Sequence, residues 1–114
     1  MAAFTLLEVW RPRPEWYALP NQKKQQFIAR AGEVLNSVIE KGAKISGVYK
    51  CRAASSHGWD MLGYWEMPSY DLINELAEKL DRMGWNRYFE QINFIGTATT
   101  AEDYMKSLVV ESEF

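Results

Sequence analysis

The sequence has a single cysteine, Cys51, and a single histidine, His57. One cysteine excludes a disulfide within the chain and a metal cluster built on several thiolates. One histidine with scattered carboxylates has no zinc or iron ligand spacing, so we expect no bound metal. Because the sequence also lacks a glycine-rich phosphate loop, a nucleophile elbow and a dinucleotide fingerprint, we expect no cofactor.

Long hydrophobic runs and a strong charge of either sign are also missing. No window approaches the ~20 apolar residues of a membrane helix. The N-terminus has no basic segment followed by an apolar one, so it does not predict a signal peptide. A net charge of -2 argues against nucleic acid or an anionic membrane as a partner. We therefore expect a cytoplasmic protein in a reducing setting.

The sequence is rich in aromatic residues. It has 114 residues, of which 47% are hydrophobic, and we expect one domain spanning residues 1–114. Five Trp, six Tyr and five Phe are more rings than so small a core can easily enclose. We expect some of them to line a pocket or a subunit interface.

The hydrophobic periodicity predicts an α+β domain. Strands are expected at about 3–10, 44–53, 59–67 and 90–97. Helices are expected at about 21–41 and from Ser69, the N-cap, to Gly84, with a short C-terminal helix after Thr100. Residues 85–89 are expected to be irregular. The order βαββαβ predicts a ferredoxin-like fold, with two helices on one face of a four-stranded antiparallel sheet and the other face open.

Alternation along each strand predicts which side chains face the helices. The expected helix-facing residues are Thr5, Leu7, Val9, Ile45, Gly47, Tyr49, Cys51, Met61, Gly63, Trp65, Met67, Ile92 and Phe94. The expected open-face residues are Phe4, Leu6, Glu8, Trp10, Ser46, Val48, Lys50, Arg52, Asp60, Leu62, Tyr64, Glu66, Gln91, Asn93 and Ile95. A β-bulge would invert part of this assignment. The open face then mixes apolar walls with polar groups, as small-molecule pockets do, although a partly polar dimer interface would use the same residues.

Glu8 is the most informative candidate on that face. A carboxylate among apolar side chains has a raised pKa, which suits a general base. An ion pair across a dimer with Lys50 or Arg52, or exposure at the strand end, would also explain it. Tyr64 and Asn93 could stabilise negative charge, and Asp60, Leu62, Glu66 and Gln91 would complete the substrate site.

Other candidates each have a structural alternative. His57 could act as an acid or base, or as an axial haem ligand, but a solitary histidine in a turn is more often a surface residue. Trp10, Trp16, Trp85 and Tyr88 could enclose a flat substrate, or they could pack in the core. Arg11 and Arg13 could bind a carboxylate, or they could form a solvated loop.

The architecture resembles the dimeric α/β-barrel superfamily, in which two ferredoxin-like sheets pair. Within it, the run from Glu8 to Leu19, with its W-R-P-R-P-x-W pattern, resembles the N-terminal signature of an uncharacterised bacterial family of short proteins. Residues 64–68, 84–85 and 88–93 resemble the same family. The superfamily includes cofactor-independent monooxygenases, polyketide cyclases, isomerases and haem-handling enzymes, so the resemblance implies a homodimer with a cavity and leaves the chemistry open.

Together these features favour a cofactor-independent enzyme acting on a small apolar or aromatic molecule. An isomerase, cyclase or monooxygenase would suit the candidate residues. The alternatives are a binding or accessory protein that uses the same cavity without turnover, and a purely structural homodimer.

Overall fold

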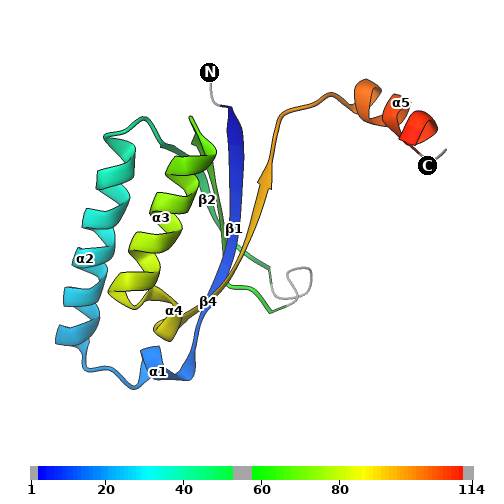
Figure 1. The fold of residues 1–114 in the computed structure, drawn as a ribbon. Coiled ribbons are helices and arrows are strands. Elements are labelled where there is room, and N and C mark those ends of the chain that lie inside the picture. Colours follow the sequence, from blue (N-terminus) through cyan, green and yellow to red (C-terminus); the bar gives the residue numbers. More distant parts are fainter. Residues whose placement is uncertain (1–2, 53–57, 112–114) are drawn as a thin grey trace.

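The computed structural model describes residues 3–52 and 58–111. Four strands form one antiparallel sheet: β1 (Phe4–Pro12), β2 (Lys44–Lys50), β3 (Met61–Met67) and β4 (Phe89–Gly96). Their order across the sheet is β2-β3-β1-β4. Helices α2 (Asn21–Ile39) and α3 (Tyr70–Met83) cover one face, and the other face carries no helix (Figure 1). The predicted ferredoxin-like α+β fold is confirmed.

The ends of α3 follow from local chemistry. Ser69 is extended and its hydroxyl accepts a hydrogen bond from the Leu72 amide at 3.1 Å, which satisfies one of the free amides of the first turn. Gly84 ends the helix in the left-handed conformation at φ 99°, where a Cβ would be strained. Both ends agree with the prediction from the sequence.

Two short helices were not predicted. No helix was expected between residues 10 and 21, but α1 (Pro14–Tyr17) begins with a proline, whose fixed φ suits the first position of a helix. Residues 85–89 were expected to be irregular, but α4 (Trp85–Tyr88) is helical. The Arg13 amide donates to the Tyr88 carbonyl at 2.8 Å, which ties the two segments together.

The core lies between the sheet and the two long helices. Its most buried members come from β1, β3, α2 and α3, and include Leu6, Trp65, Met67, Val38 and Leu76. Burying side chains of this size removes enough apolar surface from water to be the main stabilising contribution to the fold.

The strand registers correct the predicted faces of β1 and β4. Leu6 lies opposite Trp65, and Glu8 lies opposite Gly63 on β3 and Asn93 on β4. Residues directly opposite each other in an antiparallel pair share a face. Since Trp65 packs in the core under the helices, the whole even-numbered set of β1 also faces the helices. The prediction for β3 is confirmed, but those for β1 and β4 are inverted. Phe4, Leu6, Glu8, Trp10, Gln91, Asn93 and Ile95 belong to the helix side.

The open face has a different composition from the predicted one. It carries Thr5, Leu7, Val9, Arg11, Tyr49, Leu62, Tyr64, Glu66, Glu90, Ile92 and Phe94. A register shift between Ile45 and Gly47 is a β-bulge in β2, and it puts Val48 on the helix side and Tyr49 on the open side, the reverse of the prediction. Phe94, Tyr49 and Ile92 are 56%, 54% and 44% exposed. This face is therefore largely apolar.

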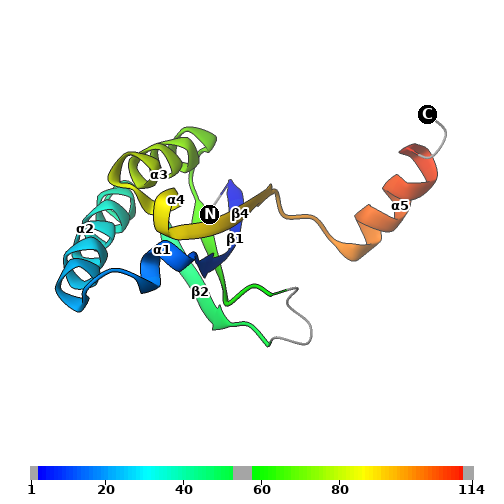
Figure 2. The ribbon, with the colours of Figure 1, turned by 90° about the horizontal axis from the view of Figure 1, so that it is seen from below.

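The C-terminal helix α5 (Ala101–Glu111) stands apart from the rest of the molecule. Seen along the sheet, α2 and α3 lie on one side and α5 lies on the other, beyond β4 (Figure 2). The Thr100 hydroxyl accepts from the Asp103 amide at 3.0 Å, which confirms the predicted cap. Within the described residues, no helix is both long and apolar enough to cross a membrane.

Candidate functional site

A cavity of about 160 Å³ lies between the sheet and the helices. The sheet contributes Glu8, Trp10, Gly63 and Trp65 to its lining, and the helices contribute apolar side chains such as Leu35. A site of about 150 Å³ lined by apolar side chains can hold benzene, so this one matches a molecule with a single ring. The cavity is therefore on the face opposite to the one predicted.

Glu8 is the only charged residue among the described residues that line this cavity. It is 8% exposed. Its Oε1 accepts from Trp65 Nε1 at 2.8 Å, and its Oε2 accepts from Gln91 Nε2 at 2.8 Å. Each carboxylate oxygen can accept a further hydrogen bond, so Glu8 can also interact with a molecule in the cavity.

The hydrogen bonds around Glu8 run in a fixed direction. Gln91 Oε1 accepts from Trp85 Nε1 at 2.8 Å, so the chain is Trp85 to Gln91 to Glu8, with Trp65 donating from the other side. An indole N–H can only donate. Because a donor stands at each end, one group in the chain must accept from both sides. A carboxylate at position 8 meets this requirement.

Burial raises the pKa of Glu8, and the hydrogen bonds from Trp65 and Gln91 oppose this shift in part. Desolvation is the largest cause because the charged form loses the water that would stabilise it. Both donors are neutral, so neither returns a full opposite charge. A carboxyl group of this kind can exchange a proton closer to neutral pH than an exposed one.

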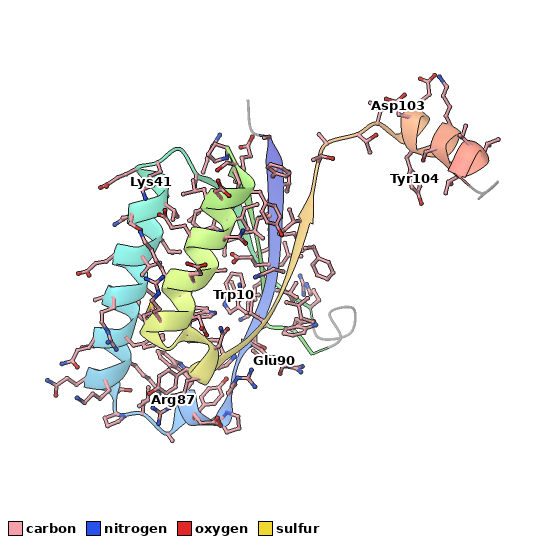
Figure 3. All side chains as sticks on the ribbon, in the orientation of Figure 1. Trp10, Lys41, Arg87, Glu90, Asp103 and Tyr104 are labelled. Carbon is pink, nitrogen blue, oxygen red and sulfur yellow. The ribbon has the colours of Figure 1, made fainter. Side chains whose placement is uncertain are left out.

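Trp10 forms one wall of the cavity, and Gly63 makes its position possible. A Cβ at Gly63 would lie 3.1 Å from Trp10 Cζ3 and 3.2 Å from Cη2, so the indole rests on bare backbone. Figure 3 shows Trp10 at the sheet, next to the helices. The sequence predicted Trp10 as a substrate contact, and the structure places it on this cavity.

Five other aromatic residues form a cluster beside the cavity. Trp16, Phe27, Tyr88 and Phe89 make edge and tilted ring contacts with centroids 4.9 to 6.0 Å apart. Trp85 stacks on Phe89 with centroids 4.1 Å apart. Trp16 and Tyr88 therefore pack with other rings, as the structural alternative for them expects, whereas Trp85 also lines the cavity.

The structure does not bring all of the predicted site residues together. Gln91 and Asn93 join Glu8, because Gln91 Nε2 also donates to Asn93 Oδ1 at 2.7 Å. The pairing of β3 with β1 places three other predicted residues on the open face of the sheet: Leu62, Tyr64 and Glu66. Tyr64 nevertheless also contributes to the cavity lining.

The other two predicted carboxylates, Glu66 and Asp60, do not line the cavity. Glu66 accepts from the Ser46 hydroxyl at 2.6 Å and lies 3.6 Å from Lys44 Nζ. The hydrogen bond from Ser46 and the charge of Lys44 lower the pKa of Glu66, so it does not resemble a general base. Asp60 is exposed and borders a shallower depression on the far side of Trp10.

Arg11 and Arg13 make their contacts within the chain. His57 lies outside the described residues. Arg11 does bind a carboxylate, but it is that of Glu90, with an Nη2–Oε1 distance of 3.0 Å, and its guanidinium lies 4.6 Å from the centre of the Trp59 ring. Arg13 Nε donates to the Asn86 carbonyl at 3.1 Å.

Trp65, which donates to Glu8, is a residue of the candidate site that the sequence did not single out. It was predicted to be an apolar core residue, and it is 3% exposed. A buried tryptophan usually needs an acceptor for its N–H, and this requirement was the signal that a polar partner such as Glu8 would lie on the same face.

The cavity does not suit a haem group. Its described lining contains no histidine or cysteine, and its volume matches a single ring instead of a macrocycle. The described residues also contain no group of three or more His, Cys, Asp or Glu side chains that could hold a metal ion.

The fold is similar to those of chlorite dismutases. A variant of chlorite dismutase from Candidatus Nitrospira defluvii superposes with a TM-score of 0.74 at 14% identity, covering 94% of this chain and 44% of that one. The complex of the same enzyme with imidazole superposes with a TM-score of 0.72 at 15% identity, covering 93% of this chain and 44% of that one. This chain therefore spans less than half the length of these proteins, and the likeness supports the superfamily fold alone.

Sequence comparison is more specific. Among curated proteins there is no match. A family model matches residues 3–110, nearly the whole chain, and its description is a family of unknown function, DUF6616. The match does not test whether the W-R-P-R-P segment is a signature, which stays a prediction. The chain belongs to the DUF6616 family.

Proposed function

We propose that this protein is a cofactor-independent enzyme that transfers a proton on a small, largely apolar molecule, with Glu8 as the acid/base group. One observation carries the proposal: a carboxyl group that neutral donors hold in place faces an otherwise apolar cavity. Burying a carboxylate costs stability unless an opposite charge compensates it. A role in chemistry gives a reason for keeping it there.

The geometry suits proton abstraction. Trp65 and Gln91 each bind one oxygen of Glu8, which fixes the carboxyl plane and leaves a lone pair on each oxygen for the substrate. When Glu8 takes a proton from a C–H or O–H group, the substrate gains the negative charge that Glu8 loses. The protonated Glu8 can then return the proton at another atom, which is an isomerisation.

The cavity limits the substrate class. About 160 Å³ admits one ring with small substituents, and the apolar walls favour a neutral molecule. A cyclic ketone or enone fits this description, because the hydrogen next to its carbonyl is acidic enough for a carboxylate base. Asn93, the predicted donor for a developing oxyanion, lies directly across from Glu8 on β4 but outside the cavity lining, where its Oδ1 accepts from Gln91 Nε2.

We also propose that a second copy covers the open face of the sheet. Three large apolar side chains on this face, Tyr49, Ile92 and Phe94, are half exposed, and such a surface is typical of a protein interface. Light scattering after size exclusion tests this directly. A monomer at micromolar concentration would contradict it.

The enzyme proposal can be tested without knowing the natural reaction. We would incubate the protein in D₂O with a panel of five- and six-membered cyclic ketones and enones, and follow exchange of the hydrogens next to the carbonyl by NMR. We expect exchange with the native protein and a loss of about 10²-fold or more in Glu8→Gln. Binding of the same compounds would be followed by ligand-observed NMR.

The outcomes separate the alternatives. Exchange that is unchanged in Glu8→Gln would remove Glu8 from the mechanism. Compounds that bind but do not exchange would favour a binding protein without turnover. Asp71→Asn, an exposed carboxylate on α3, is the control that should change neither binding nor exchange.

A further inference from the structure

One face of α5 is apolar and exposed. Tyr104, Met105 and Leu108 are 55%, 60% and 45% exposed, and their spacing of one and three residues places them on one side of the helix. Lys106 forms an ion pair with Glu102 at 3.1 Å, away from this stripe. An amphipathic helix gains most of its stability from packing its apolar side, so α5 needs a surface to cover.

The arrangement of the chain keeps α5 away from its own core. The radius of gyration is 16.8 Å, compared with about 13 Å for a compact domain of this length. The helix lies on the open-face side of the sheet and beyond the edge strand β4 (Figures 1 and 2). Figure 3 shows Tyr104 on α5, well apart from Trp10 at the sheet.

The rim of the cavity offers a matching surface at the other edge of the sheet. Ile45 and Val48 of β2 line the cavity, yet they are 38% and 54% exposed. They lie on the helix side, as their partners Trp65 and Gly63 show. β2 is an edge strand, so this side of the cavity is open to solvent.

The charges on the two surfaces are complementary. On the helix side of β2, next to Val48 in register, the charged residue is Lys50, which lies opposite Met61; Lys41 and Lys44 are paired with Glu75 and Glu66. The α5 helix carries Glu102 and Asp103 in its first turn, with Lys106 one turn further on. Opposite charges at the rim of an interface favour association and set its orientation.

We propose that α5 of one copy packs across the cavity rim of a second copy, with its stripe (Tyr104, Met105, Leu108) on the partner copy's equivalents of Ile45 and Val48. The proposal rests on the dimer through the open sheet face. In a dimer whose twofold axis runs parallel to the strands, β4 of one sheet lies over β2 of the other. The start of α5 in one copy is then close to the cavity rim of the other copy. The cavity rim of the same copy is farther, because β2 lies three strand spacings, about 14 Å, from β4 across the sheet.

This exchange would complete the site in both copies. Each α5 covers the open side of the other cavity, which excludes water from Glu8 and adds an aromatic side chain, Tyr104, at the entrance. Exchange of an equivalent element between two copies is a common route to a symmetric dimer. The cavity is then incomplete in a single copy.

Cross-linking of the full-length chain tests the contact. In a Cys51→Ser background, one preparation carries Val48→Cys and another carries Leu108→Cys. After the two are mixed, unfolded and refolded together, a short bis-maleimide reagent is added. We expect a covalent dimer from the mixture at a yield several times that of either preparation alone. Lys106→Cys, on the opposite side of α5, is the matched control and should give little product with Val48→Cys.

The remaining outcomes would overturn the proposal. A chain carrying both Val48→Cys and Leu108→Cys that cross-links within itself would show that α5 folds back on its own rim. Equal yields from the Leu108 and Lys106 positions would show that α5 makes no specific contact. A monomer in light scattering would remove the dimer on which the proposal rests. None of these results depends on Glu8 chemistry, which the exchange experiment tests separately.

Discussion

The direction of the hydrogen bonds around Glu8 leads to a prediction about exchanging two side chains. In Glu8→Gln, the new amide oxygen can accept from one neighbour, but its NH₂ group then faces the other donor. One of the contacts from Trp65 and Gln91, both 2.8 Å long, must be lost. An unsatisfied buried donor lowers the free energy of unfolding by about 1–3 kcal/mol. In domains slightly smaller than this one, each kcal/mol lowers Tm by about 4–8 °C.

The reciprocal change, Gln91→Glu, is expected to destabilise the fold more than Glu8→Gln does. It removes the donor to Glu8 Oε2 and to Asn93, and it places two carboxylates side by side. The double variant Glu8→Gln with Gln91→Glu restores the order of donors and acceptors. Trp65 then donates to the amide oxygen at position 8, and the amide nitrogen at position 8 donates to the new carboxylate at position 91. That carboxylate still accepts from Trp85.

We therefore expect the double variant to be more stable than the sum of the two single effects, by about 1–3 kcal/mol. Urea unfolding of the native protein and the three variants gives this coupling energy. Agreement with simple additivity to within about 0.5 kcal/mol would refute the argument from donor direction. Trp65→Phe removes one donor, so Glu8→Gln should lower the free energy of unfolding less in that background than in the native protein.

The difference in stability between the native protein and Glu8→Gln is expected to change with pH in a defined direction. Burial raises the pKa of Glu8 above its ordinary 4.5 in the folded state. Its contribution to stability is therefore fully present below pH 4.5 and is lost as pH rises through the raised folded value. The difference in unfolding free energy between the native protein and Glu8→Gln should decrease over that interval. Glu66 and Glu75, whose pKa values are lowered, titrate in both proteins and cancel. A difference that increases with pH would contradict a raised pKa.

Three further substitutions test other parts of the structure. Gly63→Ala should push the Trp10 indole into the cavity and destabilise the fold by about 1–3 kcal/mol; unchanged affinity for the cyclic ketones, measured by NMR, would contradict this. Ser69→Ala should cost about 1 kcal/mol in thermal unfolding through loss of the α3 cap, and no change in Tm would mean that the cap contributes little. Phe94→Glu should convert a dimer to a monomer in light scattering without lowering Tm in the monomer, because this side chain is 56% exposed.

The elements of the fold could be predicted from the sequence because their signals are local. The apolar period of α3, Ser69 before it and Gly84 after it act within a few residues of each other. The order of strands and helices then predicts the ferredoxin-like arrangement, because crossover connections in a sheet are right-handed. The α4 helix was missed because it has a single turn, and its aromatic residues are held by tertiary contacts with Trp16 and Phe27.

The faces of β1 and β4 depended on tertiary structure. In β1 both alternating sets are apolar enough to be buried, since one contains Leu7 and Val9 and the other contains Leu6 and Trp10. Placing Glu8 on the open face is reasonable when the strand is considered alone. The register with β3 settles the question, because Leu6 lies opposite Trp65.

The sequence by itself determined the four strands, the helices α2, α3 and α5 and the caps of α3, and it singled out Glu8 as the candidate carboxyl group. Only the tertiary structure decided that Glu8 faces the helices, and that Trp65 and Gln91 are its donors. The physical reason is that alternation along a strand is a local property, whereas a buried carboxyl group requires partners from other strands. Those partners come from positions 57 and 83 residues away in the chain.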